Sequence, residues 1–411
     1  MGETPQGPES TWRAVNARRL RRHRLLEAEA GAGSSDVAAV AGAICGAHVQ
    51  VLSAAELSLA LRLGGAGGGP APDASTSDAS TGGTADRRDV RRALWEDREL
   101  VKTYGARGTV HLLPTAELPL WCGALAALGE EVGTGAGPRL LTGGQIDALA
   151  AALEVILADD ELTTDELTEA LVEAVGPWAG DPVMEAFQGH WPRWRWATAL
   201  LAHRGALCFA PDKGRRVAYT SPQRWSPGFE PLEGAAAVRE LARHYLWSYG
   251  PATPAEFARW LAAPKPWAEA VFDALGEEIE PVRLNGVPCR QLAGDELADE
   301  HPVGVRLLPY FDAFAVGSHP RDLLFPGAAA TRALSRGRAG NYPVLLVEGE
   351  VAGVWHHRRS GRRLQLAVEP LRRLPGTVRS AVEEQAERVA VALEATALDF
   401  RIGEITVGPH A

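Results

Sequence analysis

Lysine is nearly absent from this chain. Lysine and arginine together number 42 in 411 residues, but only Lys102, Lys213 and Lys265 are lysines. A reaction that passes through a Schiff base needs an amine such as that of lysine. The sequence therefore offers very few candidates for covalent amine chemistry.

The chain also lacks long hydrophobic runs and closely spaced cysteines. No apolar run approaches the roughly 20 residues that span a membrane, and residues 1–8 lack the basic-then-apolar pattern of a secretory signal. Cys45, Cys122, Cys208 and Cys289 are far apart in apolar surroundings, which predicts reduced core residues. These absences predict a cytoplasmic protein that does not associate with membranes.

The formal net charge of −10 argues against a chain that binds nucleic acid over its whole surface. Arginine is nonetheless concentrated in two stretches. One is an acid-free run at residues 13–24, and the other covers residues 335–373, where eight arginines accompany three acidic residues. A basic face on an acidic body suits anion binding, but solvated surface arginines explain either stretch alone equally well.

Helical and strand patterns alternate along the chain. Residues 1–12 are expected to be disordered, and residues 64–89 form a Gly-, Ser- and Thr-rich insertion that we expect to be a mobile loop. Helices are predicted at 36–45, 57–63, 89–104, 145–157, 167–175, 194–203, 235–249, 257–262, 267–275 and 378–393, with another opening in the arginine run. Strands are predicted at 106–113, 206–209, 216–220, 279–284, 289–292, 305–308, 342–347, 351–356 and 363–368.

Local signals place some of these boundaries. Ser53, Thr163 and Thr253 each precede a glutamate by three residues, the pattern of a capping box at a helix start. Asn285-Gly286 predicts a tight hairpin turn. Helices followed by short strands recur three times, which is typical of winged-helix domains. The prediction is a helix-rich α+β fold with three tandem winged-helix domains, a C-terminal β-rich element and a closing helix.

The candidate site lies at Gly46-Ala-His48-Val-Gln50-Val-Leu52, between two predicted helices. In an extended linker, His48 and Gln50 share one side, while Val49 and Val51 face the other. The alternative is that both polar residues only belong to an inter-helix turn.

Three segments resemble a bacterial family of winged-helix DNA glycosylases of the AlkZ/YcaQ type. They are Arg107-Gly-Thr-Val-His111, Tyr249-Gly-Pro-Ala-Thr253 with Phe257-Ala-Arg-Trp260, and Leu307-Leu-Pro-Tyr-Phe-Asp312 with residues 340–355. The resemblance implies tandem winged helices around a concave DNA-binding face and hydrolysis of the N-glycosidic bond of alkylated purines, including bulky adducts and crosslinks. The family's catalytic motif, Gln-hydrophobic-Gln or Gln-hydrophobic-Asp, falls on His48-Val49-Gln50, so histidine replaces the first glutamine.

On this resemblance we divide the chain into four parts. Residues 1–125 form the first winged-helix domain, which carries the His-Val-Gln segment and the 64–89 insertion, and residues 126–234 form the second. Residues 235–300 form the third, and residues 301–411 form a β-rich region with a basic hairpin. The expected partner is double-stranded DNA with alkylated purines, bound by a monomer that needs no cofactor.

Alkylation at N7 or N3 gives the purine a positive charge, so the base is already a good leaving group. The enzyme then needs a positioned water and stabilisation of the sugar cation. We predict that His48 activates or orients this water, because imidazole accepts protons near neutral pH. Gln50 fixes the water from the other side, since a carboxamide accepts and donates hydrogen bonds but takes no proton.

The remaining candidates concern DNA binding. Lys102 is predicted to point to a phosphate, which implies a monofunctional glycosylase without lyase activity. Arg107, Thr109 and His111 alternate along a predicted strand and are expected to contact backbone phosphates, although an exposed wing strand that is merely polar explains them too. The hairpin tip around Ser360-Gly361 is predicted to insert at a groove, and the basic residues that flank it are His356, His357, Arg358, Arg359, Arg362 and Arg363.

Asp312, the tryptophan cluster and a metal site are weaker candidates for a role in function. Asp312 either orders a neighbouring arginine or supports the site. The tryptophans of the 190–196 cluster are expected in the core more often than on bases. No metal is expected, because adjacent histidines on a strand point to opposite sides and no third ligand is apparent. A non-catalytic winged-helix regulator and a protein that sequesters a drug remain the competing interpretations.

Overall fold

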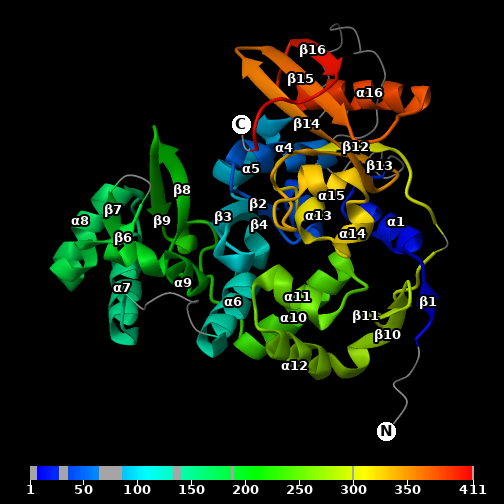
Figure 1. Ribbon diagram of the computed structural model, residues 1–411. Coiled ribbons are helices and arrows are strands. Elements are labelled where there is room, and N and C mark those ends of the chain that lie inside the picture. The colour runs from blue at the N-terminus through cyan, green and yellow to red at the C-terminus, as the bar shows by residue number, and fades with distance from the viewer. Residues whose placement is uncertain are drawn as a thin grey trace, which may run out of the picture. The chain divides into compact units, whose positions relative to one another are not determined.

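The computed structural model describes residues 7–26, 36–63, 86–132, 140–186, 189–298 and 300–409, and Figure 1 shows its ribbon. The architecture is mixed α+β, as predicted. The chain divides into two compact units: the first unit contains residues 1–92, 245–253 and 277–411, and the second contains residues 93–244 and 254–276. Of the loop expected at 64–89, residues 64–85 lie outside the described residues, as do residues 1–6. The loop prediction is wrong for residues 87–89, which belong to a helix, α5 (Arg87–Trp95).

The first unit begins with a short strand and a helix. β1 (Glu9–Ser10) pairs in parallel with β10 (Ile279–Leu284), so the expectation of disorder is wrong for these two residues. β10 pairs antiparallel with β11 (Val287–Leu292) across the predicted Asn285-Gly286 turn, where both residues have positive φ. α1 (Trp12–Arg22) then begins after Thr11, whose hydroxyl accepts a hydrogen bond from the Ala14 N–H.

Two arginines of the early arginine run, Arg18 and Arg19, form internal contacts and do not belong to a basic surface. Arg18 and Arg19 are buried. The Arg19 guanidinium donates to the carbonyl oxygens of Gly250, Pro251 and His319, while Arg18 forms an ion pair with Asp295. Because carbonyl oxygens and a carboxylate already occupy these guanidinium groups, the anion-binding expectation is wrong for Arg18 and Arg19.

A five-stranded sheet forms the C-terminal part of the first unit. Its strand order is β12-β13-β14-β15-β16. The pairs are antiparallel except β15 and β16, which are parallel because α16 connects them as a crossover helix. The helix predicted to close the chain is therefore followed by a six-residue strand, β16 (Figure 1). The bounds are β12 Val305–Leu308, β13 Val344–Val347, β14 Glu350–Ser360, β15 Arg363–Pro370, α16 Gly376–Ala392 and β16 Ala397–Ile402.

Short elements connect these parts and contribute to the core. Their bounds are α3 Val37–Ala43, β2 Ala47–His48, α4 Leu52–Leu63, α5 Arg87–Trp95, α13 Ala313–Gly317, α14 Arg321–Leu324 and α15 Ala328–Ala333. The predicted capping box at Ser53 is wrong, because α4 already begins at Leu52. Glu56 instead receives two hydrogen bonds from the Arg91 guanidinium. The core contains Trp12, Phe314, Phe325 and Val354.

The second unit combines helices with three small groups of strands. β5 (Leu162–Thr163), β9 (Arg216–Thr220) and β8 (Cys208–Lys213) form a sheet in that order. The capping box predicted at Thr163 is present. β8 and β9 pair antiparallel and form the predicted hairpin. The other bounds are β3 Leu100–Tyr104, β4 Val110–Pro114, α6 Leu118–Val132, α7 Gly143–Ile156, α8 Thr164–Val175, β6 Pro182–Glu185, β7 His190–Pro192, α9 Thr198–His203, α10 Gly234–Tyr249, α11 Pro254–Leu261 and α12 Lys265–Leu275.

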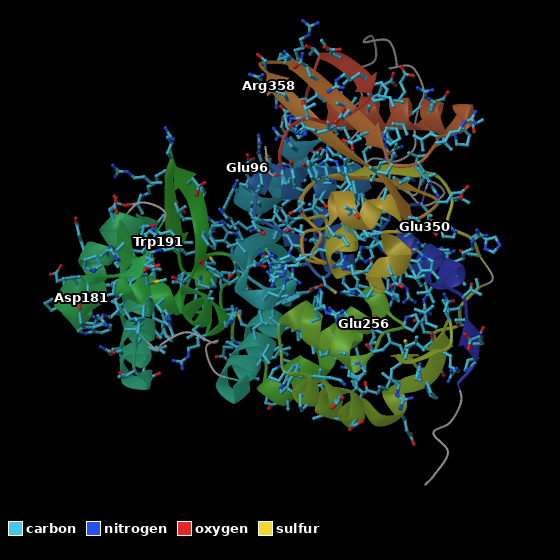
Figure 2. The ribbon with its side chains drawn as sticks, in the orientation of Figure 1. Glu96, Asp181, Trp191, Glu256, Glu350 and Arg358 are labelled. Carbon is cyan, nitrogen blue, oxygen red and sulfur yellow. The ribbon has the colours of Figure 1, made fainter. Side chains whose placement is uncertain are left out.

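Two predictions fail where a helix and a strand meet. The helix predicted over 89–104 ends at Trp95, and residues 100–104 form β3, because these residues pair with β4. The helix predicted over 194–203 begins as a 3-10 turn at residues 193–197 and becomes α9 only at Thr198. Trp194 of this turn is fully buried, as expected, whereas Trp191 is 43% exposed (Figure 2).

Candidate active site

The His48-Val49-Gln50 segment lies at a tight corner in the first unit. After α3, Cys45 and Gly46 adopt positive φ values of 55° and 86°, which turns the chain into β2. His48 is 8% exposed and Gln50 is exposed. The expected alternation is wrong: Val49 is buried and Val51 is exposed, because the strand ends at His48 and the chain bends at Gln50 to begin α4.

Two side chains from the end of α10 hold this corner. The Ser248 hydroxyl donates to the Ala43 carbonyl oxygen at 2.8 Å. The Tyr249 hydroxyl lies 3.1 Å from the Ile44 carbonyl oxygen and 3.2 Å from that of Ala313. These contacts bind the carbonyls immediately before the corner, so they position the backbone that carries His48.

Asp312 belongs to a buried ion pair and not to the surface of the site. Its carboxylate accepts two hydrogen bonds of 2.8 Å from Arg62, one of 2.7 Å from Ser58 and one from the Phe314 N–H. The side chains of Arg62 and Asp312 are both 0% exposed. Asp312 therefore orders an arginine, the first of the two predicted roles, and fastens α4 to the start of α13.

The pKa of Asp312 follows from these contacts. Burial alone raises the pKa of a carboxyl group. The positive charge of Arg62 and the hydrogen bonds from Arg62, Ser58 and Phe314 outweigh burial and hold the pKa of Asp312 below its ordinary value. Asp312 is thus a carboxylate at neutral pH, and its four hydrogen bonds leave it no part in proton transfer.

A partly open cavity begins one residue after Gln50, and we call it the aromatic cavity. Its volume is about 260 Å3. Apolar and aromatic side chains make up most of its wall, and Ser53, Arg87, Tyr310 and His357 contribute the polar groups. The lining residues are Val51, Ser53, Ala54, Leu57, Arg87, Pro309, Tyr310, Pro343, Trp355, His357 and Leu393.

The polarity of the aromatic cavity depends on its aromatic rings and on an arginine whose charge is offset by carboxylates. The ring of His357 stacks on Trp355 with a centroid separation of 5.4 Å. Burial, together with the charges of His356 and Arg87, lowers the pKa of His357 to about 4, so its imidazole is neutral at pH 7. Arg87 lies 3.7 Å from Glu56 and 3.8 Å from Glu394, which offset its charge.

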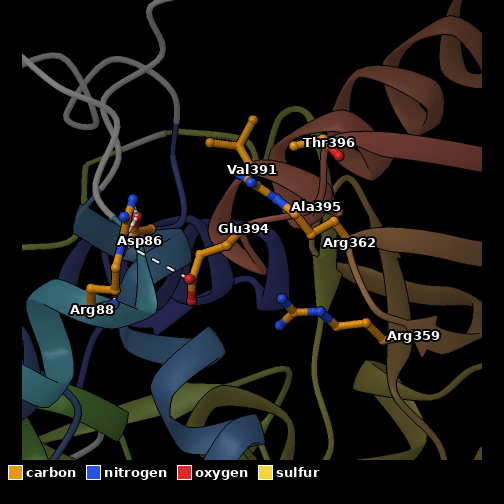
Figure 3. Close-up of a pocket in the computed structure, with 8 residues that line it drawn as sticks. All are labelled: Asp86, Arg88, Arg359, Arg362, Val391, Glu394, Ala395 and Thr396. Carbon is orange, nitrogen blue, oxygen red and sulfur yellow. Dashed lines mark hydrogen bonds and ion pairs between the residues drawn. The ribbon is translucent and has the colours of Figure 1, made fainter.

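A second, more polar pocket lies beside the hairpin and is called the arginine pocket. Its volume is about 540 Å3, and Figure 3 shows its lining residues. Arg88 forms ion pairs with Asp86 and Glu394. Arg359 donates to the Gly361 carbonyl oxygen, and in the described part of the chain neither Arg359 nor Arg362 forms an ion pair. The lining residues are Asp86, Arg88, Arg359, Arg362, Val391, Glu394, Ala395 and Thr396.

The β14–β15 hairpin presents the predicted cationic tip. Ser360 pairs with Arg363 across Gly361, whose φ is +58°. Arg358, Arg359, Arg362 and Arg363 are all exposed, and Arg358 lies near the free end of the hairpin (Figure 2). This arrangement offers four guanidinium groups to an anion.

His356 and His357 do not add charge to this tip. Both are partly buried along β14. Burial lowers the pKa of His356 below its ordinary value, as it does for His357. His357 faces the aromatic cavity, so its predicted place at the DNA-inserting tip is wrong, since the side chain lies three residues before the turn.

Lys102 belongs to the second unit, where it is mostly buried. Its ammonium group lies 4.0 Å from the Asp212 carboxylate and 4.7 Å from the centre of the Phe209 ring. Burial lowers the pKa of Lys102, while Asp212 partly offsets this effect. The contact with phosphate stays a prediction.

The Arg107–His111 segment is a turn and not a continuous strand. Arg107 has a φ of +61° in a 3-10 turn (Ala106–Gly108), and β4 begins only at Val110. Arg107 donates to the Trp260 carbonyl oxygen at 3.1 Å, and Thr109 donates to that of Ala106 at 2.9 Å. The predicted shared side of Arg107, Thr109 and His111 is therefore wrong, because the chain turns between them.

His111 has a packing role in this turn. Its ring is 1% exposed, and Nδ1 lies 2.8 Å from the Thr109 carbonyl oxygen. Burial, opposed by that hydrogen bond, lowers the pKa of His111 to about 3. A Cβ atom on Gly105 would lie 2.7 Å from this Nδ1, which is why glycine occupies that position. His111 thus has no exposed surface with which to contact a phosphate.

Several residues of the site escaped the sequence interpretation. Arg62, Arg87, Tyr310, Trp355 and Leu393 come from five separate segments. None carries a local pattern that points to the others, although the helices that contain Arg62 and Leu393 and the strand that contains Trp355 were predicted. Within the described residues, no cluster of three or more His, Cys, Asp or Glu side chains forms a metal site. All four cysteines are buried, and none of them forms a disulfide.

Comparisons with known proteins show the family to which the chain belongs. The family described as DNA glycosylase AlkZ-like matches residues 41–391. An interstrand DNA cross-link repair glycosylase of Streptomyces sahachiroi is 32% identical over 418 residues, which cover 96% of this chain and 100% of the relative. The solved structure of Streptomyces sahachiroi DNA glycosylase AlkZ superposes with a TM-score of 0.74 at 29% identity, again covering 96% and 100% of the two chains. The chain belongs to the family of AlkZ-like DNA glycosylases.

Proposed function

We propose that this protein is a monofunctional DNA glycosylase that hydrolyses the N-glycosidic bond of alkylated purines, including bulky N7-guanine adducts or crosslinks. It would serve DNA repair or self-resistance to a genotoxic natural product. The supporting observation is the position of His48-Val49-Gln50, which ends at an aromatic cavity with arginines next to it. The relative's printed activity, repair of interstrand DNA cross-links, supports the same reaction class.

The proposed hydrolysis needs little from the protein beyond placement. Water adds to C1′ of the sugar, the glycosidic electron pair passes to the cationic purine, and a neutral base leaves. His48 accepts the proton of the attacking water or orients the water, and the carboxamide of Gln50 holds it.

The positions of the lysines support a monofunctional enzyme. Lys102 is mostly buried next to Asp212. Lys213 lies 3.7 Å from Glu166, and Lys265 lies 3.5 Å from Glu269. Each ammonium group therefore has a carboxylate neighbour, and no lysine lines either of the two pockets. Borohydride treatment during turnover should trap no protein–DNA adduct, and a trapped adduct would contradict this part of the proposal.

The DNA contacts would come from exposed arginines. Arg358, Arg359, Arg362 and Arg363 carry charge without carboxylate partners in the described residues and suit backbone phosphates. The substrate would be double-stranded DNA bound by a monomer, in the cytoplasm on the nucleoid. Among the described residues, no helix is long and apolar enough to span a membrane.

The finer domain organisation belongs to the same proposal. The order α7, β5, α8, α9, β8 and β9 is that of a winged helix, and the sheet β5-β9-β8 supports it for residues 126–234. We propose corresponding modules at 1–125 and 235–300, followed by the β-rich region at 301–411. These boundaries follow the order of elements along the chain.

Alanine substitution of the two motif residues tests the reaction. His48→Ala and Gln50→Ala should each lower the single-turnover release of N7-methylguanine from duplex DNA, the former by about 100-fold or more, as for loss of a general base. His301→Ala, at an exposed histidine, serves as the matched control and should keep the wild-type rate. Wild-type rates in both motif variants would overturn the assignment.

Two competing functions make different predictions. A non-catalytic winged-helix regulator would shift unmodified duplex DNA without releasing base from alkylated DNA. A drug-sequestering protein would bind the free genotoxic compound without any DNA. Base release by the purified protein excludes both as its principal activity.

A further inference from the structure

We propose that the aromatic cavity binds the planar, uncharged ring portion of a bulky purine adduct while the arginine pocket holds a phosphate of the same DNA. The inference rests on the proposed function and names the part of the substrate that the protein recognises. The cavity begins at Val51, next in the chain to Gln50, so their Cα atoms are about 3.8 Å apart. A group attached to the reacting base thus has a recess within reach.

The two pockets lie next to each other, because three segments of the first unit contribute neighbouring residues to both. Arg87 lines the aromatic cavity and Arg88 the arginine pocket. The same holds for Leu393 and Glu394 at the end of α16. His357 and Arg359 are two residues apart on β14, so they share a face of the strand. A phosphate held by Arg359 and Arg362 therefore lies beside the opening of a ring-binding site.

The lining of the aromatic cavity fits a ring and not an anion. Trp355, Tyr310 and neutral His357 supply aromatic surface, and Leu57 and Leu393 supply aliphatic surface. The charge of Arg87 is offset by Glu56 and Glu394, whereas the arginine pocket has two guanidinium groups without ion pairs in the described residues (Figure 3). Anions would thus prefer the arginine pocket and apolar rings the aromatic cavity.

Polarity favours an adduct ring over an extruded purine. A purine carries several polar edge atoms, and burying them without partners costs free energy. The cavity offers few polar side chains for them. A dry cavity of about 150 Å3 accommodates benzene, so the volume of about 260 Å3 admits one or two fused rings.

The experiment compares two substrates in two cavity variants. Duplex DNA contains a single N7-methylguanine or a single N7-benzylguanine, and kcat/KM for base release is measured above enzyme-free depurination. Ser53→Trp fills the cavity from an exposed position on α4, and His357→Ala removes the ring that stacks on Trp355. Each should lower the benzyl-to-methyl ratio at least about tenfold, because burial of one aromatic ring contributes that much or more to binding.

A matched control and distinct outcomes complete the test. Ser380→Trp places the same bulk at an exposed serine of α16 outside both cavities and should keep the wild-type ratio. An unchanged ratio in both cavity variants would overturn the proposal; if both substrates then slow equally, the occupant is an extruded base. No release from either substrate by the wild-type protein would instead overturn the proposed function itself, and this inference with it.

Discussion

Asp312 illustrates how a buried residue holds the elements next to the His48-Val49-Gln50 segment. Its carboxylate has a complete set of hydrogen bonds from Arg62, Ser58 and Phe314, and water does not reach it. A buried pair of this kind fixes geometry more than it adds net stability. Here it fixes α4, whose first residues follow Gln50 directly.

Asp312→Asn should therefore destabilise the fold strongly. The substitution leaves the Arg62 guanidinium buried without a counter-charge, which costs about 3–5 kcal/mol when one partner of a buried pair is removed. Chemical denaturation at pH 7 measures the effect. Asp322→Asn serves as the control, because this aspartate has no ion pair in the described residues and should change stability little.

The stability difference between wild type and Asp312→Asn should depend on pH with a definite sign. Because the pKa of Asp312 is lower in the folded state, its contribution is fully present above the unfolded pKa of about 3.9 and is lost as pH falls through the folded pKa. The stability difference between wild type and Asp312→Asn should shrink below about pH 4. A difference that stays constant down to the acid limit would show that the carboxylate is not held by Arg62.

The burial of His48 depends on residues that are distant in the sequence. Histidine at position 48 is recognisable from its neighbours in the chain, but its burial is not. The carbonyls before it are held by Ser248 and Tyr249, some 200 residues away in sequence. A local pattern contains no information about such partners, which is why the alternation predicted for His48 and Gln50 failed.

Among the elements, the β14–β15 hairpin separates two functions along its length. Toward its base, Trp355 and His357 line the aromatic cavity. Toward its tip, the arginines are exposed and the strands leave the core, since residues 358–363 are all exposed. The strand alternation and the Ser360-Gly361 turn made the tip predictable, whereas the uncharged state of the two histidines depends on burial by other segments.

Salt dependence of DNA binding tests the hairpin. In the double variant Arg359→Ala/Arg362→Ala, the slope of log affinity against log salt should fall by about 2, because each neutralised phosphate contributes about 0.9. The measurement is a salt titration of binding to unmodified duplex. Arg204→Ala is the control, because the guanidinium of Arg204 is paired with Asp147. An equal loss of slope in this variant would show that the hairpin arginines do not bind DNA specifically.

At the scale of the whole molecule, buried neutral histidines occur in both units. Burial lowers the pKa of His23 and His111 to about 3 and that of His203 and His357 to about 4. His23 and His357 belong to the first unit, and His111 and His203 to the second. Each must take up a proton when its unit unfolds in mild acid.

Both units should therefore lose stability as pH falls from about 6.5 toward 4. A lowered histidine pKa contributes stability that is fully present above the unfolded value and is lost toward the folded value, with a slope of about 1 kcal/mol per pH unit for each histidine. Denaturation curves at pH 7.5, 6 and 5 measure the slope. His203→Leu should reduce it for the second unit, and an unchanged slope would show that His203 is protonated in the folded state.

The amino-acid sequence alone determined what short-range physics decides. It placed the capping box at Thr163, the hairpin at Asn285-Gly286, the arginine tip around Gly361 and the family resemblance, because caps, turns and strand alternation depend on neighbouring residues. Element boundaries failed where a distant partner decided the outcome, as when pairing with β4 made residues 100–104 a strand.

Only the tertiary structure decided which side chains meet. It buried the early arginines against carbonyl oxygens, paired Arg62 with Asp312 across 250 residues, and assembled the aromatic cavity from α4, Arg87, Tyr310, β14 and Leu393. The physical reason is that burial and ion pairing depend on packing between segments remote in sequence, and this packing also sets the charge of His357 and the exposure of Gln50.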